Sequence, residues 1–179
     1  KPVEALRRPL GEVLDEHETW VEANGRQGQR ADLSEISLEG ANLSGRNLAA
    51  AVLRSARLSG ARLEKTGLAM ADLSLADLRR ANLAGADLRG ANLQRASMSG
   101  ANLSRVRLSP VNITGPNAFI WQANLQRARL NGAVLTDADL SGAQLTGANL
   151  SGADLRGANL AGANLAGADL TDARTEGCI

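Results

Sequence analysis

Few side chains in this sequence could carry out chemistry, and their spacing argues against catalysis. His17 is the only histidine, and it falls in a stretch with helical spacing, which favours a structural role over that of a general base. Asp137 and Asp139 have no histidine or further carboxylate beside them, so we interpret them as a solvated edge, not a metal site. Cys178 is the only cysteine, which excludes an internal disulfide framework and a cysteine-based zinc site. We expect no enzyme activity, no cofactor and no metal.

The composition excludes further classes of function. Twenty Lys and Arg against nineteen Asp and Glu give a net charge of +1, which argues against a general nucleic-acid binder and against a uniformly acidic, DNA-like surface. No apolar run approaches the roughly 18 residues of a membrane span, and no signal peptide is visible. We expect a cytoplasmic protein; because the chain begins at Lys1 and not at Met, a fragment or a processed form stays an open alternative.

A five-residue repeat governs the chain after residue 30. Leu, Met or Ile recurs every five residues from Leu33 to Ile113 and, after an insertion of two residues near 114–117, from Ile120 to Leu170. This pattern gives 17 repeats before the insertion and 11 after it, 28 in all. Ala stands two residues before most of these centres, Asp or Asn often lies between, and Gly commonly ends the unit. The glycines recur at this spacing and therefore mark corners, not a phosphate-binding loop.

A period of five fits neither a helix nor a straight strand. Each step would rotate a helical side chain by about 140°, and on a strand it would reverse the face. A chain that bends once per repeat instead points both Ala and Leu inward. Such a chain winds into an all-β solenoid of short parallel strands, for which a right-handed winding is expected.

The repeats resemble a known family. Segments such as Ala86-Asp87-Leu88-Arg89-Gly90 are similar to the A(D/N)LxG unit of pentapeptide-repeat proteins, and the resemblance covers residues 31 to about 173. It implies a right-handed quadrilateral parallel β-helix with four repeats per coil, hence about seven coils, and a bacterial protein.

We expect three segments: an N-terminal helical cap over 1–30, the solenoid over 31–173 and a C-terminal tail over 174–179. Residues 9–23 have helical spacing, and this helix would cover the bottom coil through its apolar residues and an aromatic anchor, namely Leu10, Val13, Leu14 and Trp20. The stretch from His17 to Trp20 is similar to the leader segment of many bacterial members of the family. Residues 1–8 are predicted to form a short helical turn or to be disordered.

Arg46 replaces an inward Ala in the fourth repeat and is expected to reach toward Asp15 or Glu16 of the cap. At the other end, the tail is too short for a substantial helix. Family members often dimerise through C-terminal elements, so a homodimer through this end is an open alternative.

The insertion is the first candidate for a binding site. We expect two extra residues to bulge outward as a loop with Ile120 inward and two aromatic side chains in solvent; the candidate partner-binding residues here are Pro116, Asn117, Phe119 and Trp121. Exposed aromatic residues are typical binding anchors. The alternative places Phe119 in the interior and shifts the register by one.

Four arginines form the second candidate. With four repeats per coil, Arg105 and Arg107 would stack about 4.8 Å from Arg127 and Arg129. Like charges so close are unfavourable without a compensating anion, and Asp87 lies below Arg107 in the same stack. We interpret the four as a surface for an anionic partner, with a solvated arginine ridge as the alternative.

These features favour a non-enzymatic protein–protein interaction scaffold with an unknown protein partner and no direct contact with nucleic acid. A second hypothesis is a DNA-mimicking topoisomerase (gyrase) inhibitor or protector, which needs a connected anionic face. Residues 31–170 contain 14 basic and 11 acidic residues, a net of +3, which weighs against mimicry. A third is a structural repeat module of a longer protein.

Overall fold

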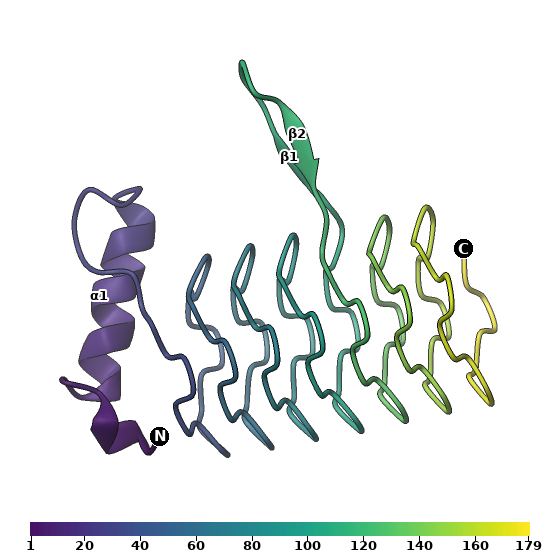
Figure 1. Cartoon of the computed structure of the whole chain (residues 1–179), viewed down its shortest axis with the longest axis horizontal. Helices are drawn as coiled ribbons and strands as arrows, with labels where there is room; N and C mark the ends of the chain where they lie inside the picture. Colours follow the sequence, from purple (N-terminus) through teal and green to yellow (C-terminus); the bar gives the residue numbers. More distant parts are fainter.

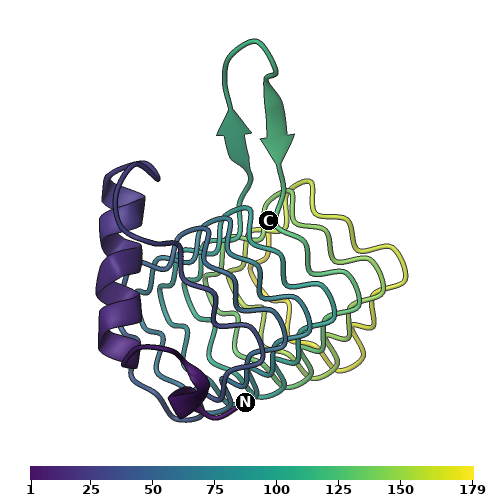
Figure 2. The same ribbon diagram turned by 60° about the vertical axis from the view of Figure 1, so that its left-hand side comes forward.

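The computed structural model describes all 179 residues. It contains a short 3-10 helix, η1 (Val3–Ala5), one α-helix, α1 (Leu10–Glu22), and two short strands, β1 (Val111–Ile113) and β2 (Phe119–Trp121). The rest of the chain winds into a stack of coils, with α1 beside the first coil and the β1–β2 hairpin projecting from the middle of the stack (Figure 1). Figure 2 shows the stack obliquely, with both the hairpin and α1 outside the coils.

Parallel β-bridges connect each coil to the next. Bridged residues are 20 positions apart, as in Asp32↔Val52 and Asp72↔Asn92, so one coil holds four pentapeptides. We call the Leu or Met at the middle of each repeat its centre. Every centre except Leu165 and Leu170 at the end of the stack donates its N–H to the next coil; Leu33 N, for example, donates to Val52 O at 2.7 Å. The chain is therefore a solenoid of stacked parallel bridges. The handedness and the total of about seven coils stay predictions.

The interior is a column of leucine and alanine. Leu88 and Ala86 are fully buried, as are nearly all their counterparts in the neighbouring coils. Each pentapeptide ends in a tight turn, which we call a corner. In one of them Ala41 N donates to Leu38 O at 3.1 Å, and Gly40 has φ 64°, the positive value that the third residue of a type II turn needs.

The predicted two-residue insertion is wrong. Solenoid pairing joins Asn92 to Asn124, which are 32 residues apart instead of 20, so twelve residues leave the coils. They form the antiparallel hairpin in which Ile113 pairs with Phe119. Neither Ile113 nor Ile120 is an inward centre, and Ile120 is 65% exposed. The physical reason is that these β-branched and aromatic residues pair well with each other across a turn, which satisfies their backbone groups outside the narrow interior. The solenoid thus has 26 centres, Leu33 to Leu108 and Leu125 to Leu170.

The helix α1 begins after Pro9 and packs its apolar side on the solenoid. Leu14 is buried, and Leu10 and Val13 pack partly buried against the core. Trp20 is half-buried. Residues 1–8 contain the helical turn η1.

Arg46 reaches α1, as expected, although one of its two predicted partners is wrong. Its Nη2 lies 2.6 Å from Asp15 Oδ1 and its Nε lies 2.8 Å from Glu18 Oε1. Glu18 replaces Glu16 because residues three apart share one side of a helix, whereas adjacent residues do not.

Candidate functional site

The β1–β2 hairpin has one apolar face and one mixed face. Val111 pairs with Trp121 and Ile113 with Phe119, so these four side chains share one face by strand alternation. The rings of Phe119 and Trp121 lie 5.7 Å apart and are tilted by 46°. Phe119 is 48% exposed and Trp121 43% exposed. The hairpin therefore presents an aromatic pair of which nearly half is open to solvent.

The base of this face rests on the solenoid. A Cβ placed on Gly90 would lie 3.0 Å from Trp121 Cδ1 and 3.3 Å from Val111 Cγ2. Gly90 therefore admits both side chains at its corner. The contact fixes the lower end of the hairpin, so its aromatic pair is positioned by the rod.

A groove runs from this contact toward α1. We call it the tryptophan groove; it has a volume of about 380 Å³, lies along one corner of successive coils and is bounded by Trp20 at one end and Trp121 at the other, with Arg30, Ala50, Met70 and Gly90 between them. Arg30 lies 6.0 Å over the Trp20 ring and donates from Nε to Ala50 O at 2.6 Å. The two tryptophans of the chain thus lie at opposite ends of one partly apolar groove.

The four candidate residues of the insertion all lie in the hairpin. Phe119 and Trp121 are exposed, as expected, and Phe119 does not enter the interior. Pro116 and Asn117 are exposed at the tip, where Ala118 N donates to Gly115 O across a turn. Trp20, Met70 and Gly90 also belong to this site, and the five-residue pattern does not indicate them. The alternation of Val-Asn-Ile and Phe-Ile-Trp around Gly-Pro-Asn is a hairpin signal that could have identified the strands.

The four arginines predicted to form one surface are separated. The centres Leu108 and Leu130 are only two repeats apart, because the hairpin residues are outside the coils. Two repeats are half a coil, so Arg107 and Arg129 lie on opposite faces. Arg107 stacks between Asp87 and Asp139, whereas Arg129 stacks between Ser97 and Asn149. The predicted like-charge stack of these pairs is therefore wrong.

Carboxylates lie beside both arginines of the first pair, although only Arg107 forms an ion pair. Arg107 Nη1 lies 3.5 Å from Asp87 Oδ2, so the expected contact with Asp87 is present. Arg105 shares its corner with Asp137 of the next coil, as the pairing of Arg107 with Asp139 requires. This side of the rod is electrostatically balanced and offers little attraction for an anion.

His17 is held in the contact between α1 and the first coil. It is fully buried, its Nδ1 accepts the N–H of Ala31 at 3.1 Å, and its ring stacks on Trp20 with centroids 5.6 Å apart. Burial lowers its pKa below the ordinary value for histidine. The N–H of Ala31 occupies Nδ1, so this nitrogen is not free to act as a base.

The remaining candidates for chemistry are dispersed. Asp139 accepts hydrogen bonds from Ser141 N and Oγ, and Cys178 Sγ donates to Leu155 O at 3.0 Å. No three His, Cys, Asp or Glu side chains come close enough together to ligate a metal ion. No helix has the length and apolar character to cross a bilayer.

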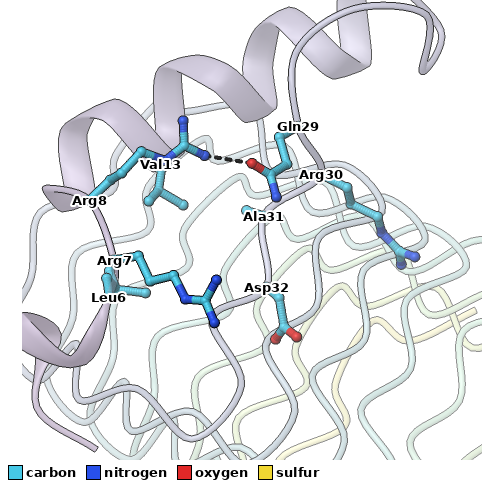
Figure 3. Close-up of a pocket in the computed structure, with 8 residues that line it drawn as sticks. All are labelled: Leu6, Arg7, Arg8, Val13, Gln29, Arg30, Ala31 and Asp32. Carbon is cyan, nitrogen blue, oxygen red and sulfur yellow. Dashed lines mark hydrogen bonds between the residues drawn. The ribbon is translucent and has the colours of Figure 1, made fainter.

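A second hollow, of about 280 Å³, lies between α1 and the first coil (Figure 3). Arg8 Nη2 donates to Gln29 Oε1 across its upper edge at 2.7 Å. The Arg7 side chain extends into this hollow, while Arg30 turns away from it (Figure 3). The hollow therefore belongs to the packing of the N-terminal segment, and the tryptophan groove is the better candidate for binding.

Comparison with protein families agrees with the repeat geometry. The family model for pentapeptide repeats matches eight copies over residues 31–66, 71–109, 120–152 and 148–178. The gap between the second and third ranges, residues 110–119, covers β1, the tip of the hairpin and the first residue of β2. No match was found among the curated proteins.

Solved structures with the same fold come from several proteins. HetL of Nostoc sp. Strain PCC 7120, a pentapeptide repeat protein involved in heterocyst differentiation regulation, is 38% identical, with 85% of this chain and 73% of that chain covered and a TM-score of 0.54. Rfr23 of the cyanobacterium Cyanothece 51142 is 36% identical over 57% of this chain, with a TM-score of 0.50. This chain spans 63% of the length of Rfr23.

QnrB1, a plasmid-mediated fluoroquinolone resistance protein, matches 84% of this chain and 73% of its own chain at 23% identity, with a TM-score of 0.64, a likeness of fold alone. The repeat of five, the four-repeat coils and the match over most of the sequence all agree. The chain belongs to the pentapeptide-repeat family.

Proposed function

We propose that this protein is a non-enzymatic protein–protein interaction scaffold whose hairpin and tryptophan groove form the contact with a protein partner. The rod holds the contact surface in place, which lowers the ordering cost of binding. Phe119 and Trp121 are the anchors, Pro116 and Asn117 form the rim at the tip, and the partner inserts an apolar side chain between Trp121 and Trp20.

The observation that carries this proposal is the contact of Trp121 with Gly90 at one end of the groove. Monomeric proteins seldom leave aromatic side chains exposed together without a function, and such residues dominate the binding energy of interfaces. Trp121 belongs to the hairpin and contacts the corner at Gly90. A partner bound at this residue would therefore touch both the hairpin and the solenoid, whose relative position is fixed by that contact.

In this proposal α1 acts as the N-terminal cap of a right-handed, quadrilateral rod of about seven coils. Burial of Leu14 and His17 against the first coil supports this role, since the end of a solenoid needs an apolar cover. A homodimer through the C-terminal end stays a prediction.

The distribution of charge weighs against a DNA-mimicking topoisomerase inhibitor. The bridged residues form four columns along the rod, and in none of them do two carboxylates occupy successive coils. One column, for example, runs Asp87, Arg107, Asp139. A DNA-like surface needs closely repeated negative charge, so the scaffold is the preferred hypothesis.

Affinity capture from cells of the source organism tests the proposal. The wild-type chain, the variant Phe119→Ala/Trp121→Ala and the control Val134→Ala/Ile179→Ala serve as baits; the control removes exposed apolar side chains outside the hairpin. We expect a partner that the wild type and the control retain and the hairpin variant loses. With the purified partner, calorimetry should show at least tenfold weaker binding for the hairpin variant.

A partner bound equally by all three baits would contradict the role of the hairpin. Stoichiometric inhibition of gyrase supercoiling by the purified chain would instead favour the topoisomerase hypothesis. Circular dichroism of each variant checks that the solenoid is intact.

A further inference from the structure

One face of the solenoid carries three arginines that form no ion pair. Other arginines of the chain fold back on the Asp two residues earlier in the sequence, with N–O distances of 2.6 to 2.7 Å, namely Arg79, Arg89 and Arg156. Arg95, Arg127 and Arg129 follow no such Asp, and they take no part in any of the ion pairs of the structure.

These three arginines are neighbours. Arg95 N donates to Gln126 O at 3.0 Å, so Arg95 and Arg127 occupy one corner in successive coils, about 4.8 Å apart along the rod. Arg129 follows Arg127 by two residues and lies in the middle of the adjoining outer face. Its bridged neighbours in the neighbouring coils are the uncharged residues Ser97 and Asn149. Like charges at this spacing repel one another. The acids in the column of Arg129, Asp77 and Asp169, each lie two coils away from it.

A groove of about 450 Å³ lies on this face, and we call it the arginine groove. Arg79, Arg95 and Arg129 line it together with Ser97 and Ser99. Its volume is more than ten times the roughly 30 Å³ of one water molecule. The groove therefore has room for several ligand groups. The Ser97 hydroxyl is a further hydrogen-bond donor there, whereas Ser99 Oγ already donates to Asn131 Oδ1 at 2.7 Å.

The only carboxylate in the lining is already engaged. Arg79 binds both oxygens of Asp77, at 2.7 and 2.6 Å. The hydrogen bond from Arg79 lowers the pKa of Asp77, and the positive charge of Arg129 lowers it further. Asp77 thus stays ionised and satisfied by Arg79, which leaves Arg95 and Arg129 open to a ligand.

We propose that the arginine groove and the adjoining Arg127 bind an acidic segment of a protein partner, with side-chain carboxylates on Arg95, Arg127 and Arg129. Guanidinium groups pair with carboxylates through two parallel hydrogen bonds, and arginines in successive coils suit carboxylates spaced along an extended chain. Leu75, 46% exposed at the edge of the groove, adds an apolar contact that a free inorganic anion could not use. This surface lies one corner away from the tryptophan groove and is independent of the hairpin.

Fluorescence anisotropy with a labelled acidic octapeptide, seven Glu and one Leu, tests this inference. The groove variant is Arg95→Gln/Arg127→Gln/Arg129→Gln, and the control is Arg105→Gln/Arg107→Gln/Arg174→Gln, which removes the same charge from other faces. We expect saturable binding to the wild type, at least tenfold weaker binding to the groove variant and a change of less than twofold for the control. Arg129→Gln alone should weaken binding at least threefold, which gives a second result if the triple variant folds poorly.

Equal losses in the two triple variants would overturn the proposal, because net charge alone would then explain binding. Absence of saturable binding would also overturn it. So would displacement of the peptide by inorganic phosphate as effective as by unlabelled peptide, which would indicate a simple anion site. None of these outcomes depends on the hairpin, so the test is separate from that of the proposed function.

Discussion

His17 Nδ1 accepts the backbone N–H of Ala31 at 3.1 Å, and this bond joins α1 to the first residue of the solenoid core. The acceptor role requires an imidazole without a proton on Nδ1. Protonation of His17 would turn the acceptor into a donor facing another donor. The junction between helix and coil is therefore sensitive to the charge of one side chain.

We predict that acid weakens the fold through His17. Burial lowers the pKa of His17 in the folded chain, so the unfolded chain takes up the proton first as the pH falls. The free energy of unfolding should be at its full value above about pH 6.5 and should decrease as the pH falls below it, until the folded form is also protonated. Thermal melts of the wild type and His17→Gln between pH 5 and pH 8 measure this difference. A Tm that falls in parallel in both proteins would contradict the prediction.

We predict that Arg46 and Glu18 stabilise the fold as a pair. Their side chains are 29% and 31% exposed, so solvent screens the ion pair only in part, and a coupling of about 1 kcal/mol is expected. Urea unfolding of Arg46→Ala, Glu18→Gln and the double variant gives this coupling as the departure from additivity. Coupling of the same size in 1 M NaCl would show that packing, not charge, holds the two together.

We predict that Gly90→Ala disturbs the hairpin, whereas Gly60→Ala does not. Both glycines have φ near 65°, so each substitution costs about 1–2 kcal/mol through the backbone. Only at Gly90 does the new Cβ meet another side chain, 3.0 Å from Trp121 Cδ1; at Gly60 nothing lies within 4 Å. The tryptophan emission of Gly90→Ala should shift relative to the wild type, while that of Gly60→Ala stays unchanged. Identical emission spectra would mean that Trp121 does not rest on Gly90.

We predict that Leu75→Gly changes the free energy of unfolding by less than about 1 kcal/mol, far less than Leu88→Gly in the interior. Leu75 has φ 62° although it is not glycine, so glycine relieves about 1–2 kcal/mol of backbone strain. The loss of a side chain that is 46% exposed and the higher entropy of glycine in the unfolded chain oppose this gain by a similar amount. Urea unfolding measures the net change, and a loss of several kcal/mol would show that the side chain packs more than its exposure suggests.

The solenoid could be predicted from the sequence because one physical requirement repeats. Only a bend in every unit brings Leu33, Leu88 and Leu150 into one interior, and each of them is indeed fully or almost fully buried. The helix was equally accessible, since Leu10 and Leu14 are one turn apart. These predictions rest on many residues that all obey one pattern.

The hairpin could not be found from the five-residue pattern because Ile113 and Ile120 fit it by coincidence. The pattern records apolar character and spacing, and it cannot distinguish an inward Ile from one in a projecting strand. Because the hairpin residues were counted as repeats, the pattern predicted Arg107 and Arg129 in one column, although they lie half a coil apart. The contact of Trp121 with Gly90 could not be predicted for the same reason, because it depends on the corner at which the chain leaves the solenoid.

The hairpin also leaves the pairing between neighbouring coils unchanged. Asn92 and Asn124 pair across it like any two residues of neighbouring coils, and Leu93 N still donates to Asn124 O at 2.7 Å. Both ends of the excursion meet at a single corner, so its length is free of any constraint from the stack. Such a corner is a natural grafting point: a different recognition loop could be exchanged there while the supporting coils keep their sequence and their shape.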